Sequence, residues 1–594
     1  MQARYEWVEK EKGDRSAVLK LSRELELPEI IAQVLVSRGI SSKADARSFL
    51  TPEIKRDLGA PSDFPGVDAA VSRIWQAVQR GEHIVVFGDF DVDGVCAAVI
   101  LDKALSAVGA ENSVFLPLRE PEGYGLTMPA IERCLNETPE KPGLLITVDC
   151  GIGSVHEVRY LKDQSIDVVI TDHHECGEKL PEAVAVVNPH CGASAGAEYL
   201  CGAGVAFKVA HALVQHAQQN GVETDKGLAG QLVVAAGLAT VADIVPLQGE
   251  NRLFASSAMK LWKNFAGKGL HALLNRALTR PQETPDAYTF GFVLGPRINA
   301  SGRMASAMVA YELLMTDDPD RARELAAELE GFNGERRGVQ NRILKLAREQ
   351  CGLDAGKFES PAVVVGGYGK SCGESDGWHP GVAGIVASQL CEETGCPAAV
   401  IVFDSDGGGR GSVRAGSQHH ALETLSACSE VLDGFGGHAK AAGFQLRPRF
   451  FERFKKLFID SCAAQVAGQK AATPLSFEAW LDPHQITYEM AGHIRKLAPF
   501  GLKNRMPRWA LRDVTLENVR TMGASADHMQ FVIKTVSEMS VRAVWFKSGD
   551  LTDDLKKGDC VDMVFELVQN DFRGCPEIEL RIIDMRTKAA SDSN

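Results

Sequence analysis

The chain has 594 residues, too many for one compact core, so we expect about three to five domains. Hydrophobic residues make up 45% of the chain and charged residues 24%, which excludes a disordered or collagen-like protein. The net charge of −14 argues only weakly against a nucleic-acid partner, because carboxylates in a metal site add negative charge and a local basic groove is enough to bind a strand.

No membrane or secretory segment is expected. The most apolar stretch, residues 232–247, is shorter than the roughly 18 residues of a membrane helix and carries Asp243. The first 14 residues are charged and lack the apolar region of a signal peptide. The 14 cysteines include no CxxC pair, so we expect neither a zinc site nor a disulfide framework. These features predict a cytoplasmic protein that does not bind membranes.

The first part of the chain, residues 1–78, is predicted to be a helical lead-in. Short capped helices are expected in the segments that follow Pro28 and Ile40. From residue 79 to 302, short apolar runs alternate with helical stretches, including a helix from Val95, which predicts a parallel sheet with helices on both faces. The expected strands lie at 84–88, 113–117, 144–148, 167–171 and 184–187.

Residues 303–352 are predicted to form a connecting helix. Asp318 followed by Pro319 is a favourable helix start, and the charged stretch after it would form a helix of about 30 residues, roughly 45 Å long. Three glycines predict a kink or break in it: Gly331, Gly334 and Gly338.

A smaller α/β domain is predicted for residues 353–470, with a strand on either side of one helix and a closing helix at 451–468. Residues 471–594 are predicted to contain a bridge and then five alternating strands. Five such strands in about 80 residues are typical of an OB-type β-barrel, a fold that often binds single strands. The predicted fold class is therefore α/β with a C-terminal barrel.

The most specific motif is GDFDVDG, which places Asp89, Asp91 and Asp93 at alternate positions directly after a predicted strand. Carboxylates this close repel one another unless cations neutralise them. An EF-hand calcium loop is excluded, because it requires Glu at its twelfth position, where this chain has Ile100, and a helix before the loop.

Further polar residues follow the next predicted strands. Asp149 ends LLITVD, His173 and His174 end DVVITDHH after Asp172, and Asp243 lies in an apolar stretch. Each alone is explained by capping, pairing or surface exposure. Together they place carboxylates and imidazoles where open α/β sheets bind ligands. Such ligands suit Mn²⁺ or Mg²⁺, and two of these cations can promote hydrolysis of a phosphoester.

The sequence resembles known proteins at this point. The stretches DxDxDG, VDCG, DHH and VADIVPL are similar to the four motifs of the DHH phosphoesterase superfamily. GPRINASGR, GWHPGVAGIVAS, RGSVRAG and FGGHAKAAGF resemble the RecJ family of single-strand-specific exonucleases, the last three in its DHH-associated domain. The resemblance covers roughly residues 20–590. The stretch PFGLKNRMP departs from the family's PFG-x-GN-P pattern, and no role is assigned to it.

The resemblance implies a two-metal centre. Asp89 and Asp91 would bind one cation, and Asp149 would bridge to a second, which is bound by the remaining ligands Asp93, His173 and Asp243. Which of the first three aspartates is not a direct ligand stays open. The implied catalytic residues are Asp149, His173 and His174; His174 would contact the scissile phosphate or orient water, with Asp172 positioning the loop.

The second α/β domain is rich in glycine, arginine, serine and histidine in what we expect to be short loops. Glycines let the backbone approach a phosphate closely, and arginine binds it in a bidentate manner. The expected substrate-binding residues are Arg297, Asn299, Arg303, His379, Arg410, Ser412, Arg414, Gly436, Gly437 and His438. Two aromatic residues, Phe292 and Trp378, are interpreted as packing residues in preference to base-stacking ones.

The resemblance implies an exonuclease that acts on single-stranded DNA from 5′ to 3′ and releases 5′-mononucleotides, in DNA repair and recombination. Its implied partners, besides a strand with a free 5′ end, are single-strand-binding protein and a helicase. One alternative is a small-substrate DHH phosphoesterase that hydrolyses oligoribonucleotides or cyclic dinucleotides, but such relatives are shorter and lack the barrel. A scaffold without catalysis is the other, but it would have lost metal ligands that are all present here.

Overall fold

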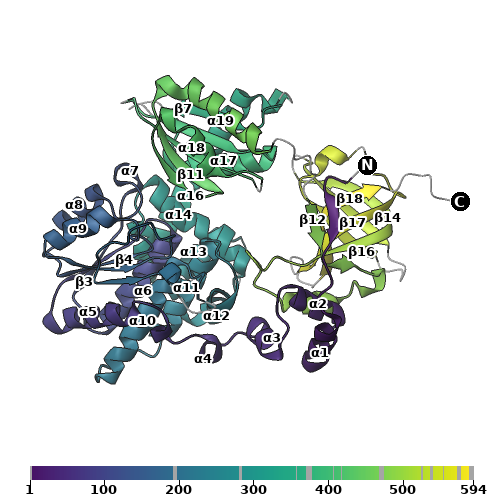
Figure 1. The fold of residues 1–594 in the computed structure, drawn as a ribbon. Coiled ribbons are helices and arrows are strands. Elements are labelled where there is room, and N and C mark those ends of the chain that lie inside the picture. The colour runs from purple at the N-terminus through teal and green to yellow at the C-terminus, as the bar shows by residue number, and fades with distance from the viewer. Residues whose placement is uncertain are drawn as a thin grey trace.

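The computed structural model describes residues 3–587 except 192–196, 280–283, 356–357, 370–376, 406, 417, 467–473, 524–525, 535–539, 553 and 571–576. Figure 1 shows three bodies: a large α/β domain, a smaller α/β domain above it and a β-barrel to one side, next to which the N-terminal helices lie. Among the described residues, no helix combines the length and hydrophobicity needed to cross a bilayer.

The large domain is built on a five-stranded parallel sheet with the order β3-β2-β4-β5-β6, as the alternating pattern predicts. Side chains of β2 alternate between its two faces: Ile84 and Val86 pack in the core that includes α5, α6 and α10, while Val85 and Phe87 pack with α8 and α9. The strands are β2 Ile84–Phe87, β3 Asn112–Phe115, β4 Leu144–Val148, β5 Asp167–Thr171 and β6 Ala185–Val187.

Eleven helices of the described chain accompany this sheet, and the last of them leads towards the connecting helix. The apolar stretch that contains Asp243 forms α11, which is buried in the core of the domain. The helices are α5 Val67–Arg80, α6 Val92–Ala107, α7 Arg119–Glu122, α8 Met128–Glu137, α9 Val155–Asp163, α10 Gly202–Gln219, α11 Leu228–Ala242, α12 Gly249–Phe265, α13 Gly267–Ala277, α14 Gly295–Met304 and α15 Met308–Met315.

Helix α6 begins at Val92, three residues before the predicted start at Val95. The reason is Asp91, whose side chain caps the helix by accepting hydrogen bonds from the amides of Asp93 and Gly94. Asp93 therefore lies in the first helical turn and not in a loop. A Cβ on Gly94 would lie 2.6 Å from backbone atoms of Asp89, so glycine is needed for this tight connection.

The connecting helix α16 runs from Pro319 to Cys351 without interruption. The predicted kink or break at its glycines is therefore wrong. The space around these glycines is open, because no atom lies within 4 Å of a Cβ placed on Gly331, Gly334 or Gly338. Glycine weakens a helix by only about 1 kcal/mol, and burial of Leu325, Leu329 and other residues of α16 offsets this cost.

The smaller domain has a mixed sheet with the order β10-β11-β9-β8-β7. The two predicted strands and the helix between them are confirmed, but RGSVRAG and FGGHAKAAGF are largely strands, not the short loops that we expected. The elements are β7 Val363–Tyr368, α17 Pro380–Thr394, β8 Ala398–Phe403, β9 Gly409–Arg414, α18 Ala421–Ala427, β10 Leu432–Gly437, β11 Ala441–Leu446 and α19 Phe451–Gln465. The expected end of the closing helix, at 467–468, lies outside the described residues.

All five predicted strands of the C-terminal region are confirmed, and they close into a barrel. Consecutive pairs run β14-β15-β16-β18-β17, and β17 returns to pair with β14. The pairing of β16 with β18 is parallel and the others are antiparallel. The elements are β12 Pro474–Phe477, β13 Ala479–Trp480, α20 Tyr488–Arg495, β14 Arg508–Met522, β15 His528–Lys534, β16 Ser540–Trp545, β17 Cys560–Asn570 and β18 Glu577–Thr587.

The N-terminal segment packs on this barrel. The two helices predicted after Pro28 and Ile40 are present, and they share one hydrophobic core with the bridge and the barrel strands. An unpredicted strand, β1, pairs in parallel with β12, more than 460 residues away along the chain. The N-terminal elements are β1 Glu6–Glu9, α1 Arg15–Leu25, α2 Glu29–Ser37, α3 Lys43–Leu50 and α4 Ile54–Asp57.

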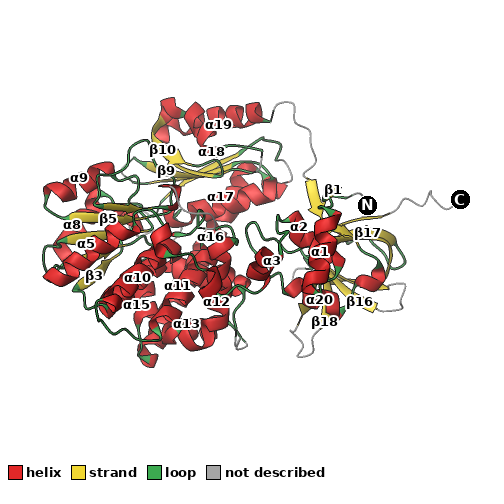
Figure 2. Ribbon diagram, turned by 60° about the horizontal axis from the view of Figure 1, so that its bottom comes forward, coloured by secondary structure: helices red, strands yellow, loops and turns green. Residues whose placement is uncertain are grey.

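Arg252 of α12 joins the large domain to the barrel side, where α3 lies between the two bodies (Figures 1 and 2). Its buried guanidinium lies 3.7 Å from the centre of the Phe49 ring and donates to the Phe49 carbonyl. It also donates to three successive carbonyls, those of Leu497, Ala498 and Pro499. Burial lowers the pKa of Arg252 to about 9, so these carbonyls are what make its charge tolerable there.

We expect Arg252→Met to loosen the barrel from the large domain, because it leaves four carbonyls without their shared donor. Loss of buried hydrogen bonds to a charged group costs roughly 2–5 kcal/mol. In calorimetry, the barrel should then unfold in a separate transition, at a lower temperature than the large domain. Lys260→Met on the same helix is the control, since the Lys260 ammonium donates to one carbonyl, at 3.4 Å, among the residues that the structure describes. Identical profiles for both variants would contradict this role of Arg252.

Candidate metal centre and anion site

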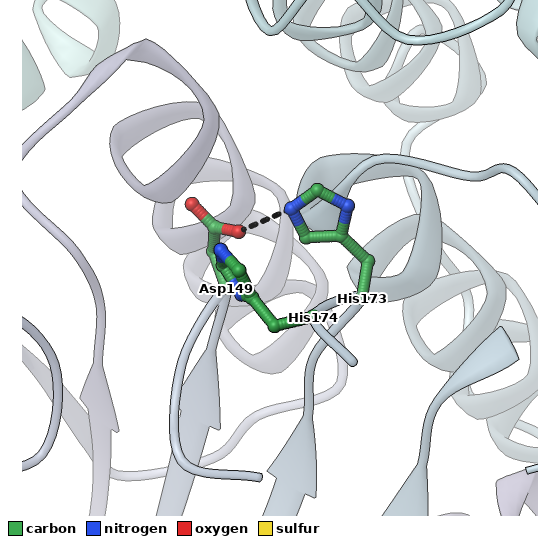
Figure 3. A group of neighbouring side chains, drawn as sticks. All are labelled: Asp149, His173 and His174. Carbon is green, nitrogen blue, oxygen red and sulfur yellow. Dashed lines mark ion pairs between the residues drawn. The ribbon is translucent and has the colours of Figure 1, made fainter. Parts of the chain in front are cut away.

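The acidic motif residues converge at the carboxyl ends of the sheet. Asp89 follows β2, Asp149 follows β4, His173 follows β5, and Asp243 caps the end of α11. His173 lies at the middle of the group: its Nε2 is 3.2 Å from Asp149 Oδ1, 3.7 Å from Asp93 Oδ2 and 3.8 Å from Asp243 Oδ2. Figure 3 shows the imidazole of His173 directed towards the carboxylate of Asp149.

These side chains form three overlapping groups of possible metal ligands. In each group, the ligand atoms lie within 4.8 Å of one another. The groups are Asp89, Asp91 and Asp149; Asp93, His173 and Asp243; and Asp149, His173 and His174. The first two coincide with the two ligand sets that the sequence resemblance implies, and Asp149 Oδ1 contacts His173 of the second set.

Asp149 is held by an unusual backbone. Its φ of 60° lies in the left-handed region, and its amide donates to the carbonyl of Thr171 on the neighbouring strand. The first residue of α10, Gly202, leaves space for its side chain, because a Cβ there would lie 2.5 Å from Asp149 Oδ1. Strain of this kind costs about 1–3 kcal/mol and persists where the surroundings impose it, typically at functional sites.

Two of the carboxylates have a buried oxygen without a hydrogen-bond donor among the described residues, and such oxygens suit cations. Asp89 Oδ1 and Asp149 Oδ1 are buried and accept no hydrogen bond from the described residues. Burial, and then the charges of neighbouring aspartates, raise the pKa of Asp89 and of Asp149 well above the ordinary range. Carboxylate oxygens together with an imidazole nitrogen are ligands that suit Mg²⁺ or Mn²⁺, and a bound cation would neutralise the repulsion between the carboxylates. The residues therefore fit a centre for divalent cations.

Asp91 and Asp93 also hold the surrounding helices. Asp91 Oδ1 caps α6, while the two oxygens of Asp93 accept from the amides of Gly202 and Ala203 at the start of α10. A carboxylate at a helix N-terminus is favoured by the exposed amides and the helix dipole. These bonds fix Asp93 next to His173 and leave Asp89 as the carboxylate of the motif with a buried oxygen that accepts no hydrogen bond from the described residues.

His174 takes a different direction from His173 (Figure 3). Its Nδ1 lies 2.7 Å from Asp172 Oδ1, and its Nε2 lies 2.9 Å from the hydroxyl of Tyr124. Asp172 also accepts from the amides of Ile152, His173 and His174, so it organises the loop. Burial acts to lower the pKa of His174, but the hydrogen bond and charge of Asp172 outweigh it and raise the pKa.

Two residues at this site were not predicted from the sequence. Tyr124 contacts His174 across 50 residues of sequence, and no spacing pattern predicts such a contact. Arg119 stacks on the Phe90 ring with a 3.9 Å separation and donates to the carbonyl of Gly302 at 3.3 Å. Burial lowers the pKa of Arg119, and the charges of Asp89 and Asp91 oppose that change. Arg119 thus brings a cation next to the acidic group.

The strand β9 explains the pattern of the arginines in RGSVRAG. Arg410, Ser412 and Arg414 occupy alternate positions and therefore share one face of the sheet. That face packs on α17, where a Cβ on Gly384 would lie 2.9 Å from Arg414 Nη2 and 3.6 Å from Ser412 Oγ. The opposite face is buried, with Gly411 against the ring of Phe444.

A cationic group gathers where the two α/β domains meet. Arg303 of α14 donates to the carbonyl of Gly381 at the start of α17, and the His379 side chain caps that helix. Burial and then the nearby charge of Arg119 lower the pKa of Arg303 to about 10, with Arg336 and Arg414 adding to the effect. Several arginines close to one another around a helix N-terminus form a site that favours an anion.

Other expected substrate-binding residues have different neighbours. Arg297 forms an ion pair with Glu330 of α16, and Asn299 accepts from the amide of Val92, which supports the start of α6. Arg410 pairs with Glu120 of the large domain. Arg297 therefore has an acidic partner on α16, and Asn299 supports the acidic motif by accepting a hydrogen bond from its backbone.

The hairpin of β10 and β11 carries the remaining expected residues. Ala441 pairs with Arg414, so the turn that contains His438 lies at the Arg414 end of β9. His438 is exposed, and Gly437 has a φ of 138° that favours glycine. No atom lies within 4 Å of a Cβ placed on Gly436. These residues border the cationic group, and the open space at Gly436 leaves room beside it for a ligand.

Trp378 and Phe292 were both interpreted as packing residues, and the structure agrees for one of them only. Trp378 is 5% exposed and packs in the core under α17, as we expected. Phe292 is 69% exposed, so its interpretation as a packing residue is wrong. It lies on a π-helical turn, Thr289–Leu294, and stacks on Tyr288 with a centroid distance of 5.1 Å.

Comparisons with known proteins agree with this architecture. The N-terminal domain of the DHH family matches residues 83–236, the DHHA1 domain matches 362–464, and the RecJ OB domain matches 477–584. The single-stranded-DNA-specific exonuclease RecJ of Bacillus subtilis is 33% identical over 97% of this chain and 70% of its own length. RecJ of Escherichia coli is 32% identical over 80% of this chain and 82% of its own.

A solved structure is similar over almost the whole chain. The crystal structure of RecJ in complex with Mn²⁺ from Thermus thermophilus superposes with a TM-score of 0.82 at 28% identity, over 99% of this chain and 80% of that one. Domain order and topology are therefore shared along with sequence.

Replacing Asp149 tests whether the acidic group is built for cations. Asp149→Asn removes one charge from a repelling group, so the cation-free protein should melt no lower than wild type and up to roughly 2–4 °C higher. The stabilisation by Mn²⁺, about 2.7 kcal/mol for wild type at one hundred times the dissociation constant, should largely disappear. Thermal unfolding with and without Mn²⁺ measures both effects.

Asp172→Asn is the matched control for that variant. The pKa of Asp172 is lowered, because the hydrogen bonds and charge of His174 outweigh its burial. The same substitution should therefore destabilise the protein at this position. A cation-free Asp149→Asn protein that is destabilised like Asp172→Asn, and that keeps its response to Mn²⁺, would contradict a metal centre.

Proposed function

Because the chain belongs to the RecJ family of single-stranded-DNA-specific exonucleases, we propose that it removes 5′-mononucleotides one at a time from the 5′ end of single-stranded DNA. The observation that carries this proposal is the juxtaposition of two sites. An acidic group suited to divalent cations lies in the large domain, and a cationic group suited to a terminal phosphate lies where the smaller domain meets it.

Mn²⁺ and Mg²⁺ occur in the solved Thermus thermophilus RecJ structures, and divalent cations are the cofactors that fit this chain. Asp89, Asp91 and Asp149 would hold one cation. Asp93, His173 and Asp243 would hold a second, with Asp149 between them. Cations there supply Lewis acidity to a phosphodiester oxygen and make water a nucleophile at neutral pH.

The protein's own residues would then orient the substrate and handle protons. His174 lies beside the acidic group with one nitrogen bonded to Asp172 and the other to Tyr124. It is placed to contact the scissile phosphate or to orient water, and Asp172 fixes its ring as a carboxylate does for many catalytic histidines. Arg119, whose charge acts on Asp89, would stabilise negative charge on the phosphate.

Recognition of the 5′ end is assigned to the cationic group. Arg303, Ser412 and Arg414 surround the start of α17, where backbone amides and the helix dipole favour a phosphate. His379, which caps this helix, and His438, on the adjacent hairpin turn, would complete the site. Arg410 would act as a link between the domains through Glu120 in place of binding phosphate directly.

The small-substrate alternative is not favoured. The similarity to RecJ proteins extends along nearly the whole chain and includes the barrel, which the RecJ OB domain matches. Barrels of this type usually bind single strands through basic grooves and aromatic side chains. We propose that the barrel holds the strand downstream of the cleaved end.

We also propose partners and a location that rest on the family resemblance alone. A helicase would supply the single strand that the site requires, and single-strand-binding protein would present it. Repair and recombination of DNA are the processes that need such an activity, and the cytoplasm is where this chain would meet DNA in a bacterium. Co-purification with each candidate partner tests the first two assignments.

The direct test of the function uses matched DNA strands labelled at the 5′ or the 3′ end. Purified protein with Mn²⁺ should release the 5′ label first, as a mononucleotide, and should leave blunt duplexes largely intact. Chelation of the cation should stop the reaction. Release of the 3′ label first, or internal cuts, would overturn the proposed polarity, whereas hydrolysis of only di- or trinucleotides would favour the small-substrate alternative.

His174→Ala should lower the turnover rate by roughly 10²–10⁴, the usual effect of losing one proton-transfer or positioning group. Its metal content should stay at the wild-type value, because Asp149 and the two proposed ligand sets are unchanged. Tyr124→Phe, which keeps the ring and loses the hydroxyl, should have a smaller effect. Loss of one metal equivalent in His174→Ala on elemental analysis would make His174 a ligand and contradict this assignment.

Arg414→Ala should weaken binding of 5′-phosphorylated strands by roughly 10- to 150-fold, the effect of losing a charge-assisted hydrogen bond of about 1.5–3 kcal/mol. Strands with a 5′-hydroxyl should be affected much less. Arg447→Ala is the control, since Arg447 is exposed in the same domain and pairs with Asp433. The measurement is the Michaelis constant for both kinds of strand, and an equal loss on both would refute end recognition by Arg414.

A further inference from the structure

We propose that Tyr288 and Phe292 form a stacking platform for unpaired bases of the strand, beside the metal centre. This inference rests on the proposed function and adds a binding surface in the large domain that the family motifs do not contain. The two rings are 65% and 69% exposed, and they stack on each other with an angle of 22° between their planes. Two large aromatic side chains on one surface turn are costly to expose unless they meet a partner.

The platform is adjacent to a proposed metal ligand. Its helical turn, Thr289–Leu294, packs on the last turn of α11, the helix that Asp243 caps. A Cβ on Gly291 would lie 3.5 Å from Val241 Cγ1, and one on Gly295 would lie 3.4 Å from the Ala242 Cβ. These close approaches fix the turn that carries the rings against the end of α11, next to Asp243.

The connection after Asp243 adds a second exposed apolar feature. Ile244 is 69% exposed and has a φ of 58°, a conformation that β-branched residues rarely adopt. Three residues later, the amide of Leu247 donates to the carbonyl of Leu502, in the loop that leads to the barrel. This hydrogen bond joins the segment that follows Asp243 to the loop of Leu502 and Lys503, which are both exposed.

The position of the rings, between Asp243 and the segment that contacts the loop leading to the barrel, favours a nucleic-acid strand as the occupant. A strand that has its 5′-terminal phosphodiester at the metal centre and its downstream part on the barrel must cross the space between them. Along that course, bases can stack on aromatic rings without regard to sequence, and a phosphate can contact an exposed lysine. A protein partner would need no such link to Asp243 on one side and to the barrel on the other.

The test compares three variants of the full-length protein. Tyr288→Ala with Phe292→Ala removes both rings, while Tyr288→Phe with Phe292→Tyr keeps both. Tyr488→Ala removes another exposed tyrosine, on α20, as the control. The substrates are 5′-phosphorylated thymidine oligonucleotides, either complete or with one abasic residue placed in turn at each of the internal positions near the 5′ end.

With wild type and the ring-keeping variant, an abasic residue at the position that stacks should raise the Michaelis constant by roughly 5- to 150-fold, the equivalent of 1–3 kcal/mol per stacked base. The double alanine variant should show this loss already on the complete strand and should no longer distinguish the abasic one. Its turnover number should change little. Dissociation constants from fluorescence anisotropy without catalytic cations should follow the same order.

Two results would overturn the inference. One is a double alanine variant that binds and hydrolyses strands like wild type and the Tyr488→Ala control, which would leave the rings to a protein partner. The other is a double variant that still distinguishes complete from abasic strands to the wild-type degree. A wild-type protein that binds strands through the platform but hydrolyses none would instead contradict the proposed function, so the two failures are distinguishable.

Discussion

Mutual repulsion among buried carboxylates is the constraint on which the rest of the structure depends. Asp89, Asp93 and Asp149 are buried close to one another, and burial together with like charges raises the pKa of each. Such a group would open or become protonated unless the chain held it in place. Cation binding therefore explains why these carboxylates are buried together. The surrounding backbone holds them in this arrangement.

The means of holding it are mostly backbone contacts. The left-handed conformation at Asp149, the absent side chain at Gly202 and the amides at the start of α10 fix the carboxylates by contacts that do not depend on their charge alone. Asn299 and Gly302 of α14 contact the backbone of the same motif. Helix α14 also makes the contact with the smaller domain. The acidic and cationic groups are thus positioned by the same helix, which sets the distance between them.

Sequence patterns predicted much of this structure. The sheet strands and the five barrel strands follow from apolar runs and alternation, and the residues of the acidic group follow from motifs at strand ends. Long-range contacts, such as that of β1 with β12 or of Tyr124 with His174, could not be predicted. Local patterns carry no information on which distant segments meet. The strand β9 was missed for another reason: its glycines resemble a loop, although Arg410, Ser412 and Arg414 alternate as strand residues do.

Side-chain partners explain the remaining differences. Arg297 and Arg303 lie on one helix, yet one pairs with Glu330 and the other donates to Gly381 of the smaller domain. Nothing in the motif distinguishes them. The stretch PFGLKNRMP, to which no role could be assigned, lies at the junction of the bodies. Arg252 binds the carbonyl of its first residue, Pro499, and those of the two preceding residues, Leu497 and Ala498. Asn504, within the stretch, donates to the carbonyls of Leu497 and Pro499.

The proposed function requires this acidic group to bind two divalent cations that share Asp149. The most direct measurement is an anomalous difference map, collected at the manganese absorption edge, from crystals of the protein soaked in Mn²⁺. We expect two peaks: one within ligand distance of Asp89, Asp91 and Asp149, and one within ligand distance of Asp93, His173 and Asp243, with Asp149 contacting both. A single peak, or a peak whose ligands include His174 in place of His173, would contradict two cations that share Asp149.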